Sequence, residues 1–105
     1  RETPTPSGKD LGLTVRELNP YLARRYGLQT KEGLLITEVT RYSQAERKGL
    51  RAGDIIIEVN RIKIKSLEDL EGILDKLDSG DPIILLIRRE RDGRAQEFVV
   101  TLRIP

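Results

Sequence analysis

Strand-like and helix-like patterns of apolar residues follow one another along the whole chain, and together they predict an α+β domain. Alternating or continuously apolar segments, which are typical of strands, lie at 11–17, 33–39, 55–59, 62–64, 82–89 and 96–104. Apolar residues spaced three and four positions apart, which are typical of helices, lie at 20–26, 43–48 and 66–77. The pattern therefore predicts five to six strands and two to three helices.

Residues 49–60 carry the clearest local signals, because they read as the end of a short helix, a tight turn and a buried strand. Gly49 stands where a helix commonly ends with a residue in the left-handed conformation. Gly53 and Asp54 form a turn signal, and the Asp54 side chain is expected to accept hydrogen bonds from nearby backbone N–H groups. The three isoleucines at 55–57 need apolar cover on both faces, so this strand is predicted to be central.

The first helix has a clear start and stop. Asn19 is expected to be the N-cap, Pro20 the first helical residue and Gly27 the residue after the end. Its tyrosines, Tyr21 and Tyr26, are expected to pack against the domain rather than to form a stacking platform.

Two serines and one turn complete the local expectations. Ser43 and Ser66 each have an acidic residue three positions later, which predicts a capping box at two helix starts. Asn60 and Arg61 stand where a two-residue hairpin turn belongs. Because a positive φ at Arg61 would cost about 1 kcal/mol or more, we expect a wider turn there.

The composition excludes several classes of protein. Nineteen Lys and Arg against 17 Asp and Glu leave a net charge of only +2, with the signs interspersed, which argues against a nucleic-acid or membrane-surface protein. The chain has no Cys and no His, so we predict no metal site, no cofactor and no enzymatic activity of its own. No apolar run approaches the roughly 20 residues of a membrane span. The lack of Met, Cys, His and Trp beside abundant Glu, Lys and Arg is typical of a thermophile protein.

The chain divides into a short leading segment and one domain. Residues 1–8 have prolines at alternate positions and no apolar periodicity, so they are predicted to form an extended linker. Residues 9–105 are predicted to form the domain. The chain begins at Arg1 rather than at Met, and we interpret it as a fragment of a longer protein.

The stretch Gly-Leu-x-x-Gly-Asp-(apolar)3-x-Val-Asn at 49–60, preceded by Ser-x-Ala at 43–45, resembles the PDZ domain family. More narrowly, it is similar to the PDZ domains of bacterial Do-type (DegP-like, HtrA-type) serine proteases, and the resemblance spans residues 9–104. It implies a partly open antiparallel β-barrel or sandwich with the permuted connectivity of bacterial PDZ domains. The helix at 19–28 is typical of bacterial protease PDZ domains rather than signalling ones, and the sequence Val-Asn-Arg at 59–61 favours the second, C-terminal PDZ domain of such a protease.

The same resemblance implies a binding site for the end of a peptide. Leu11, Gly12 and Leu13 correspond to the loop whose backbone N–H groups bind a terminal carboxylate, and Lys9 is placed to add positive charge. A glycine at the start of a strand also predicts close approach of another group. Asp10 departs from the apolar residue often found at its position, and its charge would weaken carboxylate binding unless Lys9 neutralises it. The alternative is that residues 11–13 are only the start of a strand with a bulge.

The strand after this loop and the longest helix are expected to form the walls of the site. Thr14 and Val15 would pair with the incoming peptide strand, while Leu70 and Leu74 would reach the pocket from the helix. The alternative is that the whole apolar face of this helix belongs to the core, namely Leu67, Leu70, Ile73, Leu74 and Leu77.

Two functions follow from the resemblance. In the first, the domain is a non-catalytic module of a serine endopeptidase that binds extended C-terminal or unfolded segments by β-strand addition and so recruits or senses unfolded clients. In the second, it is a structural domain that contacts neighbouring PDZ or protease domains and holds oligomeric cages together. Both imply a periplasmic or cell-envelope location and partners that are neither nucleic acid nor membrane. Site-two and C-terminal-processing proteases are alternative parents.

Overall fold

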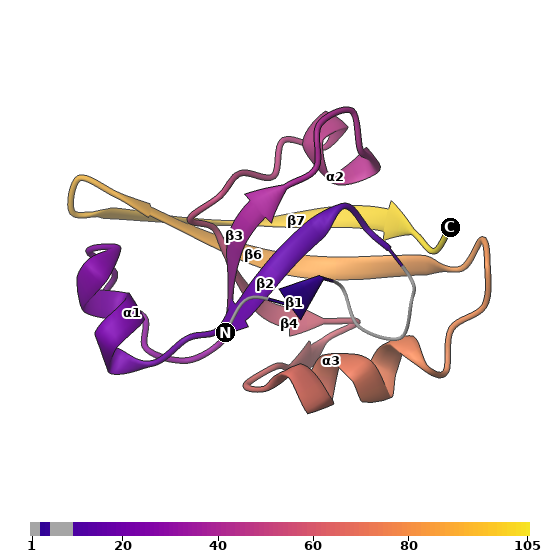
Figure 1. Cartoon of the computed structure of the whole chain (residues 1–105), viewed down its shortest axis with the longest axis horizontal. Helices are drawn as coiled ribbons and strands as arrows, with labels where there is room; N and C mark the ends of the chain where they lie inside the picture. Colours follow the sequence, from indigo (N-terminus) through magenta and orange to yellow (C-terminus); the bar gives the residue numbers. More distant parts are fainter. Residues whose placement is uncertain (1–2, 5–9) are drawn as a thin grey trace.

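The computed structural model describes residues 3–4 and 10–105, and in this part of the chain it forms an α+β domain of seven strands and three short helices (Figure 1). The predicted fold class is confirmed. In chain order the elements are β1 (Thr3–Pro4), β2 (Leu13–Glu17), α1 (Pro20–Arg25), β3 (Leu34–Val39), α2 (Gln44–Arg47), β4 (Ile55–Val59), β5 (Ile62–Lys63), α3 (Leu67–Leu74), β6 (Pro82–Arg91) and β7 (Arg94–Arg103).

All strand pairs that the structure describes are antiparallel, and the main sheet has the order β1-β2-β3-β4-β6-β7, with β5 paired to β4. Strand β4 lies between β3 and β6, so its predicted central position is confirmed. The last two strands form a hairpin that runs the length of the molecule (Figure 1). The chain thus enters the sheet near one edge, at β1 and β2, and finishes with β7 at the other.

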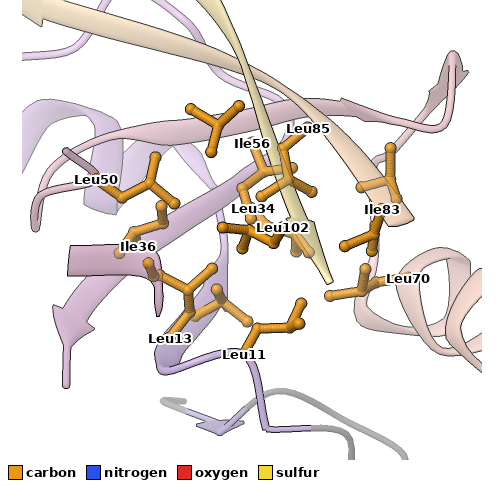
Figure 2. Close-up of a cluster of buried hydrophobic side chains, with 14 of the residues drawn as sticks. Leu11, Leu13, Leu34, Ile36, Leu50, Ile56, Leu70, Ile83, Leu85 and Leu102 are labelled. Carbon is orange, nitrogen blue, oxygen red and sulfur yellow. The ribbon is translucent and has the colours of Figure 1, made fainter. Parts of the chain in front are cut away.

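Apolar side chains form two clusters on the two faces of the sheet. Ile56 belongs to the larger cluster and its neighbour Ile55 to the smaller one, because successive strand residues point to opposite faces. Figure 2 shows the larger cluster, in which Leu11, Leu13, Leu70 and other side chains from distant parts of the chain converge. The smaller cluster lies beneath α1 and consists of Leu18, Leu22, Ala23, Leu35 and Ile55.

The turn between β4 and β5 is narrower than the sequence predicts. Val59 pairs with Ile62, so Asn60 and Arg61 alone make the turn, with φ angles of 51° and 68°. The predicted wider turn is therefore wrong. Tertiary contacts explain the difference, since the Asn60 side chain accepts a hydrogen bond from the Ile84 N–H at 2.8 Å and its N–H donates to the Ile84 carbonyl at 2.7 Å. These bonds hold Asn60 in the left-handed region. Arg61 must then also take a positive φ, because these two residues alone complete the turn.

Helix α1 has the caps that the sequence predicts but buries fewer residues. The Asn19 side chain accepts a hydrogen bond from the Leu22 N–H at 2.8 Å, and Gly27 has a φ of 67°. Tyr21 and Tyr26 are 61% and 43% exposed, so the expectation that they pack is wrong. A helix of six residues has room for only a narrow buried face, and Leu22 and Ala23 fill it.

Candidate functional site

The loop before β2 is held closely against the start of α2. Gly12 has a φ of 84°, and a Cβ atom built on it would lie 2.4 Å from the Cβ of Ser43, the N-cap of α2. The Thr40 N–H also donates to the Gly12 carbonyl at 2.8 Å. The predicted close approach at this glycine is thus confirmed, and the group that approaches is Ser43. Only glycine fits here, because both the space and the backbone conformation exclude a side chain.

Asp10 folds back onto this loop. Its Oδ1 accepts a hydrogen bond from the Gly12 N–H at 2.8 Å, while the residue itself stays exposed to solvent. The Asp10 carboxylate therefore occupies the Gly12 N–H, one of the backbone donors predicted to bind the terminal carboxylate of a peptide. Lys9, the residue expected to neutralise Asp10, lies outside the described residues, and its role stays a prediction.

Strand β2 is paired along both edges. On one side it pairs with β3, with a register shift between Thr14 and Val15. On the other side it pairs with β1, where Thr3 lies opposite Val15 and Pro4 opposite Thr14. The backbone of residues 3–4, within the segment predicted to be a linker, is thus extended and lies where a strand can add to β2.

The predicted wall residues from β2 and α3 meet in the larger core cluster. Leu13, Val15, Leu70 and Leu74 all lie there and are each less than 5% exposed. Leu11 joins them from the loop, as Figure 2 shows. Thr14 is half-buried and alternates with these residues along β2. The structure brings these side chains together, and their contact with a ligand stays a prediction.

Helix α3 is fixed at its first turn by three side chains. The Ser66 Oγ accepts from the Asp69 N–H at 3.1 Å and the Asp69 carboxylate accepts from the Ser66 N–H at 3.2 Å, which confirms the predicted capping box. The hydrogen bond from the Lys65 N–H, together with those from Ser66, lowers the pKa of Asp69. Glu17, at the end of β2, accepts from the Leu67 N–H at 2.8 Å and so ties β2 to the start of α3.

The Gly-Asp turn is anchored by an arginine that the sequence did not single out. Asp54 is buried and accepts from the Arg51 N–H at 3.0 Å, as expected, but also from Arg89 Nε and Nη2, both at 2.8 Å. Arg89 donates further to the Gly49 carbonyl at 2.9 Å, and its guanidinium lies 4.9 Å from the centre of the Phe98 ring. The hydrogen bonds to Asp54 raise the pKa of Arg89. Arg89 thus links the β6–β7 hairpin to the Gly-Asp turn and to Gly49, which follows α2. The Asp54–Arg89 pair therefore holds these parts of the scaffold together.

Arg88, the neighbour of Arg89 in β6, also forms ion pairs. It donates from Nε to Glu90 at 2.7 Å and from Nη1 to Glu97 at 2.9 Å, and its pKa is raised by these bonds. Glu90 accepts further hydrogen bonds from the N–H groups of Gln29 and Thr30 at 2.6 and 3.3 Å. Burial alone would raise the pKa of Glu90, but the bonds from Arg88, Thr30 and Gln29 outweigh it and lower the pKa to about 2.

A hollow of about 590 Å³ lies beside Glu90, between the end of α1 and the turn of the β6–β7 hairpin. Both carboxylate oxygens of Glu90 already accept hydrogen bonds there. Glu90 is therefore a bonded structural acid in this hollow, and the hollow does not involve β2 or α3.

The described residues, 3–4 and 10–105, include no group of three or more His, Cys, Asp or Glu side chains placed to hold a metal ion. Within the same residues no helix is long and apolar enough to cross a membrane.

A glycine loop that leads into a sheet strand, with a helix beside that strand and permuted strand order, is the architecture of PDZ domains. The family model described as "PDZ domain" matches residues 9–102, and the chain belongs to this family. It is related to the PDZ domains of DegP/HtrA-type serine proteases, as the named relatives show. A protein of Marinomonas sp. (strain MWYL1) named "Probable periplasmic serine endoprotease DegP-like" is 35% identical over 92 residues, which are 88% of this chain and 19% of that protein.

Further relatives agree with this assignment. A protein of Haemophilus influenzae named "Probable periplasmic serine protease do/HhoA-like" is 33% identical over 89% of this chain and 20% of its own length. The chain thus spans about a fifth of the curated relatives it matches. Among solved structures, "HtrA-type protease AlgW with decapeptide" has a TM-score of 0.70 and 25% identity over 90% of this chain and 29% of that chain. The HtrA3 PDZ domain bound to a phage-derived ligand has a TM-score of 0.74 and 20% identity over 100% of this chain and 86% of that chain, and supports the fold.

Proposed function

We propose that this chain is a peptide-binding PDZ module of a Do-like serine protease, and that it binds extended polypeptide by adding it as a strand to β2. One observation carries the proposal. The edge of β2 away from β3 already pairs with an extended antiparallel segment, Thr3–Pro4, so its backbone groups are positioned to receive a strand. Backbone pairing gives affinity for any extended segment, and neighbouring side chains give preference among sequences.

The proposed roles of the site residues follow the geometry of the loop, β2 and α3. The backbone of Leu11, Gly12 and Leu13 forms the end of the site, and Lys9, which is outside the described residues, is proposed to add positive charge there. Thr14 and Val15 pair with the peptide. Leu70 and Leu74 form the apolar support on the α3 side, because they share the larger cluster with Leu13 and Val15.

We further propose the context of the module from its relatives. The parent is a serine endopeptidase, the module is its non-catalytic second PDZ domain, and the location is the periplasm or cell envelope. There the module would recruit or sense unfolded clients. The names of the DegP-like relatives support the endopeptidase and the periplasm, and the solved relatives with bound peptide support the ligand class.

A titration of the isotope-labelled 105-residue chain tests peptide binding directly. An extended peptide with apolar side chains is added to millimolar concentration. The control is a peptide of the same length with proline at alternate positions, which lacks the N–H groups for pairing at those positions. We expect backbone amide shifts at Thr3, which the peptide displaces, and at 10–17 and 67–74 with the first peptide, and none with the second. Shifts of equal size and place with both peptides, or no shifts with either, would refute strand addition.

A second function, assembly of protease oligomers, is favoured by a different surface. Ile84 and Val99 lie on the outer face of β6 and β7 and are 37% and 63% exposed, and together with Leu86 they line a hollow of about 280 Å³. An apolar patch of this kind is suited to contact with a neighbouring domain. If assembly is the function, Val99→Asp in the intact parent shifts its oligomer distribution while peptide binding to the module is unchanged. An unchanged distribution would leave peptide binding as the function.

A further inference from the structure

The donor at the centre of the carboxylate-binding loop is already satisfied inside the chain. The Gly12 N–H donates to Asp10 Oδ1 at 2.8 Å, and its single hydrogen cannot serve a second acceptor at full strength. Gly12 itself is locked in place, because Thr40 holds its carbonyl and Ser43 fills the space beside it. Asp10 thus stands, by its chemistry, in the place of a ligand's terminal carboxylate.

The segment that pairs with β2 also lacks a chain terminus at this end. Thr3 lies opposite Val15 and Pro4 opposite Thr14, so the segment runs antiparallel to β2 and toward the Gly12 loop. At Pro4 the chain continues toward residue 5 and does not end in a carboxylate. The segment seated on the edge of β2 is therefore an internal one.

From these two observations we propose that Asp10 is a specificity-determining residue that makes this module select internal extended segments over C-terminal ones. The proposal rests on strand addition at β2, the function proposed above, and defines its ligand class. An internal segment pairs with β2 and passes the loop with Asp10 in place. A terminal carboxylate must either displace Asp10 from Gly12 or lie beside it, where two like charges repel.

Two features of Asp10 allow its effect on ligand preference to be measured without a change in the fold. The residue is exposed and belongs to neither apolar cluster, so its replacement leaves the core intact. Repulsion between exposed charges is screened by salt, so the penalty on a terminal carboxylate must shrink as ionic strength rises. A purely steric block at the loop would have no such salt dependence.

The test compares two forms of one apolar peptide, with a free and with an amidated C terminus, on the 105-residue chain. The ratio of the two dissociation constants is the readout. Competition from residues 3–4 reduces the apparent affinity of both forms by the same factor, so it cancels in the ratio. In the wild type we expect the amidated form to bind at least as tightly as the free acid.

Two variants of Asp10 should change the ratio of the two dissociation constants by different amounts. Asp10→Asn keeps an acceptor for Gly12 but removes the charge, and Asp10→Ala removes both. We expect the preference to move toward the free acid in the order wild type, Asp10→Asn, Asp10→Ala, by about tenfold in total, the value of one charge-assisted hydrogen bond. Asp92→Asn is the matched control, because Asp92 lies in the distant β6–β7 turn and tolerates asparagine at its φ of 52°. It should leave the ratio unchanged.

The outcomes separate the two proposals. A wild type that binds the free acid tenfold more tightly than the amide, or a ratio that does not change in Asp10→Ala, overturns the role of Asp10 while strand addition stands. No binding of either peptide to any of the four proteins overturns strand addition, and the inference with it.

Discussion

Loss of the Asp54–Arg89 ion pair should destabilise the domain more than any exposed substitution. In Asp54→Asn the carboxylate that accepts three hydrogen bonds becomes an amide, and its NH₂ group faces the donors of Arg89. Breaking a buried pair from one side costs about 3–5 kcal/mol. The Arg89 side chain keeps 21% exposure and can regain some water, so we expect a loss of about 3 kcal/mol, the lower end of that range.

Arg89→Met should cost more, about 4 kcal/mol, because it leaves an unpaired carboxylate whose side chain is only 2% exposed. Urea unfolding followed by circular dichroism at pH 7 measures both, and a loss of 3 kcal/mol corresponds to a decrease in Tm of about 15 °C for a domain of this size. Since the two variants remove one interaction, the double variant should cost about 2 kcal/mol less than the sum of the single ones.

Arg94→Met is the control for the loss of an arginine, because Arg94 is exposed in the same hairpin, and it should change stability by less than about 0.5 kcal/mol. The reasoning would be refuted by strictly additive single variants, or by an Asp54→Asn protein that loses less than about 1 kcal/mol.

Three further substitutions test other parts of the structure. Gly12→Ala should cost about 2–3 kcal/mol in urea unfolding, because of the positive φ and because the new methyl group would displace Ser43, the N-cap of α2; a neutral effect would contradict the close approach. Arg61→Gly should stabilise by about 0.5–1 kcal/mol, since glycine accepts a φ of 68° without strain, and a lower urea midpoint would be contrary evidence. Glu90→Gln should cost about 2 kcal/mol at pH 7. Because the pKa of Glu90 is lowered from 4.5 to about 2, its contribution is complete above pH 4.5 and is lost as the pH falls toward 2. The wild type and Glu90→Gln should therefore converge in that window, and a constant difference would argue against the assigned bonds.

Local signals in the sequence were sufficient for the N-caps, the glycine turns and the central strand. The full capping box predicted at Ser43 is wrong, because the Glu46 carboxylate accepts from the Tyr42 N–H instead of the Ser43 N–H. Ser66 with Asp69, Asn19 with Pro20, and the isoleucines of β4 each act through neighbours a few residues away or through burial alone, so spacing along the chain defines them. The family resemblance added the order of the strands, which local patterns do not contain.

Interactions between distant residues were the ones that sequence reasoning missed. Asp54 and Arg89 are 35 residues apart, and they meet only because β4 pairs with β6. Arg61 takes a positive φ because Asn60 is bonded to Ile84, 24 residues further on. The bond between Asp10 and the Gly12 N–H is an exception, because it joins residues only two positions apart; the sequence analysis considers the charge of Asp10 but not this local bond.

Strand β1, which pairs with the edge of β2, and the charge of Asp10 affect the binding of a ligand in different ways. Unpaired strand edges attract other chains, and β1 covers this edge at two positions, one of them Pro4, which has no N–H to donate. Strand β2 has five residues, so an incoming segment that pairs with more than these two positions can replace β1. The tethered segment competes at an effective concentration on the order of millimolar, which weakens every ligand equally. Asp10, in contrast, acts only on ligands that carry a carboxylate at their end. The first feature therefore sets how tightly this edge binds, and the second sets which part of a polypeptide it binds.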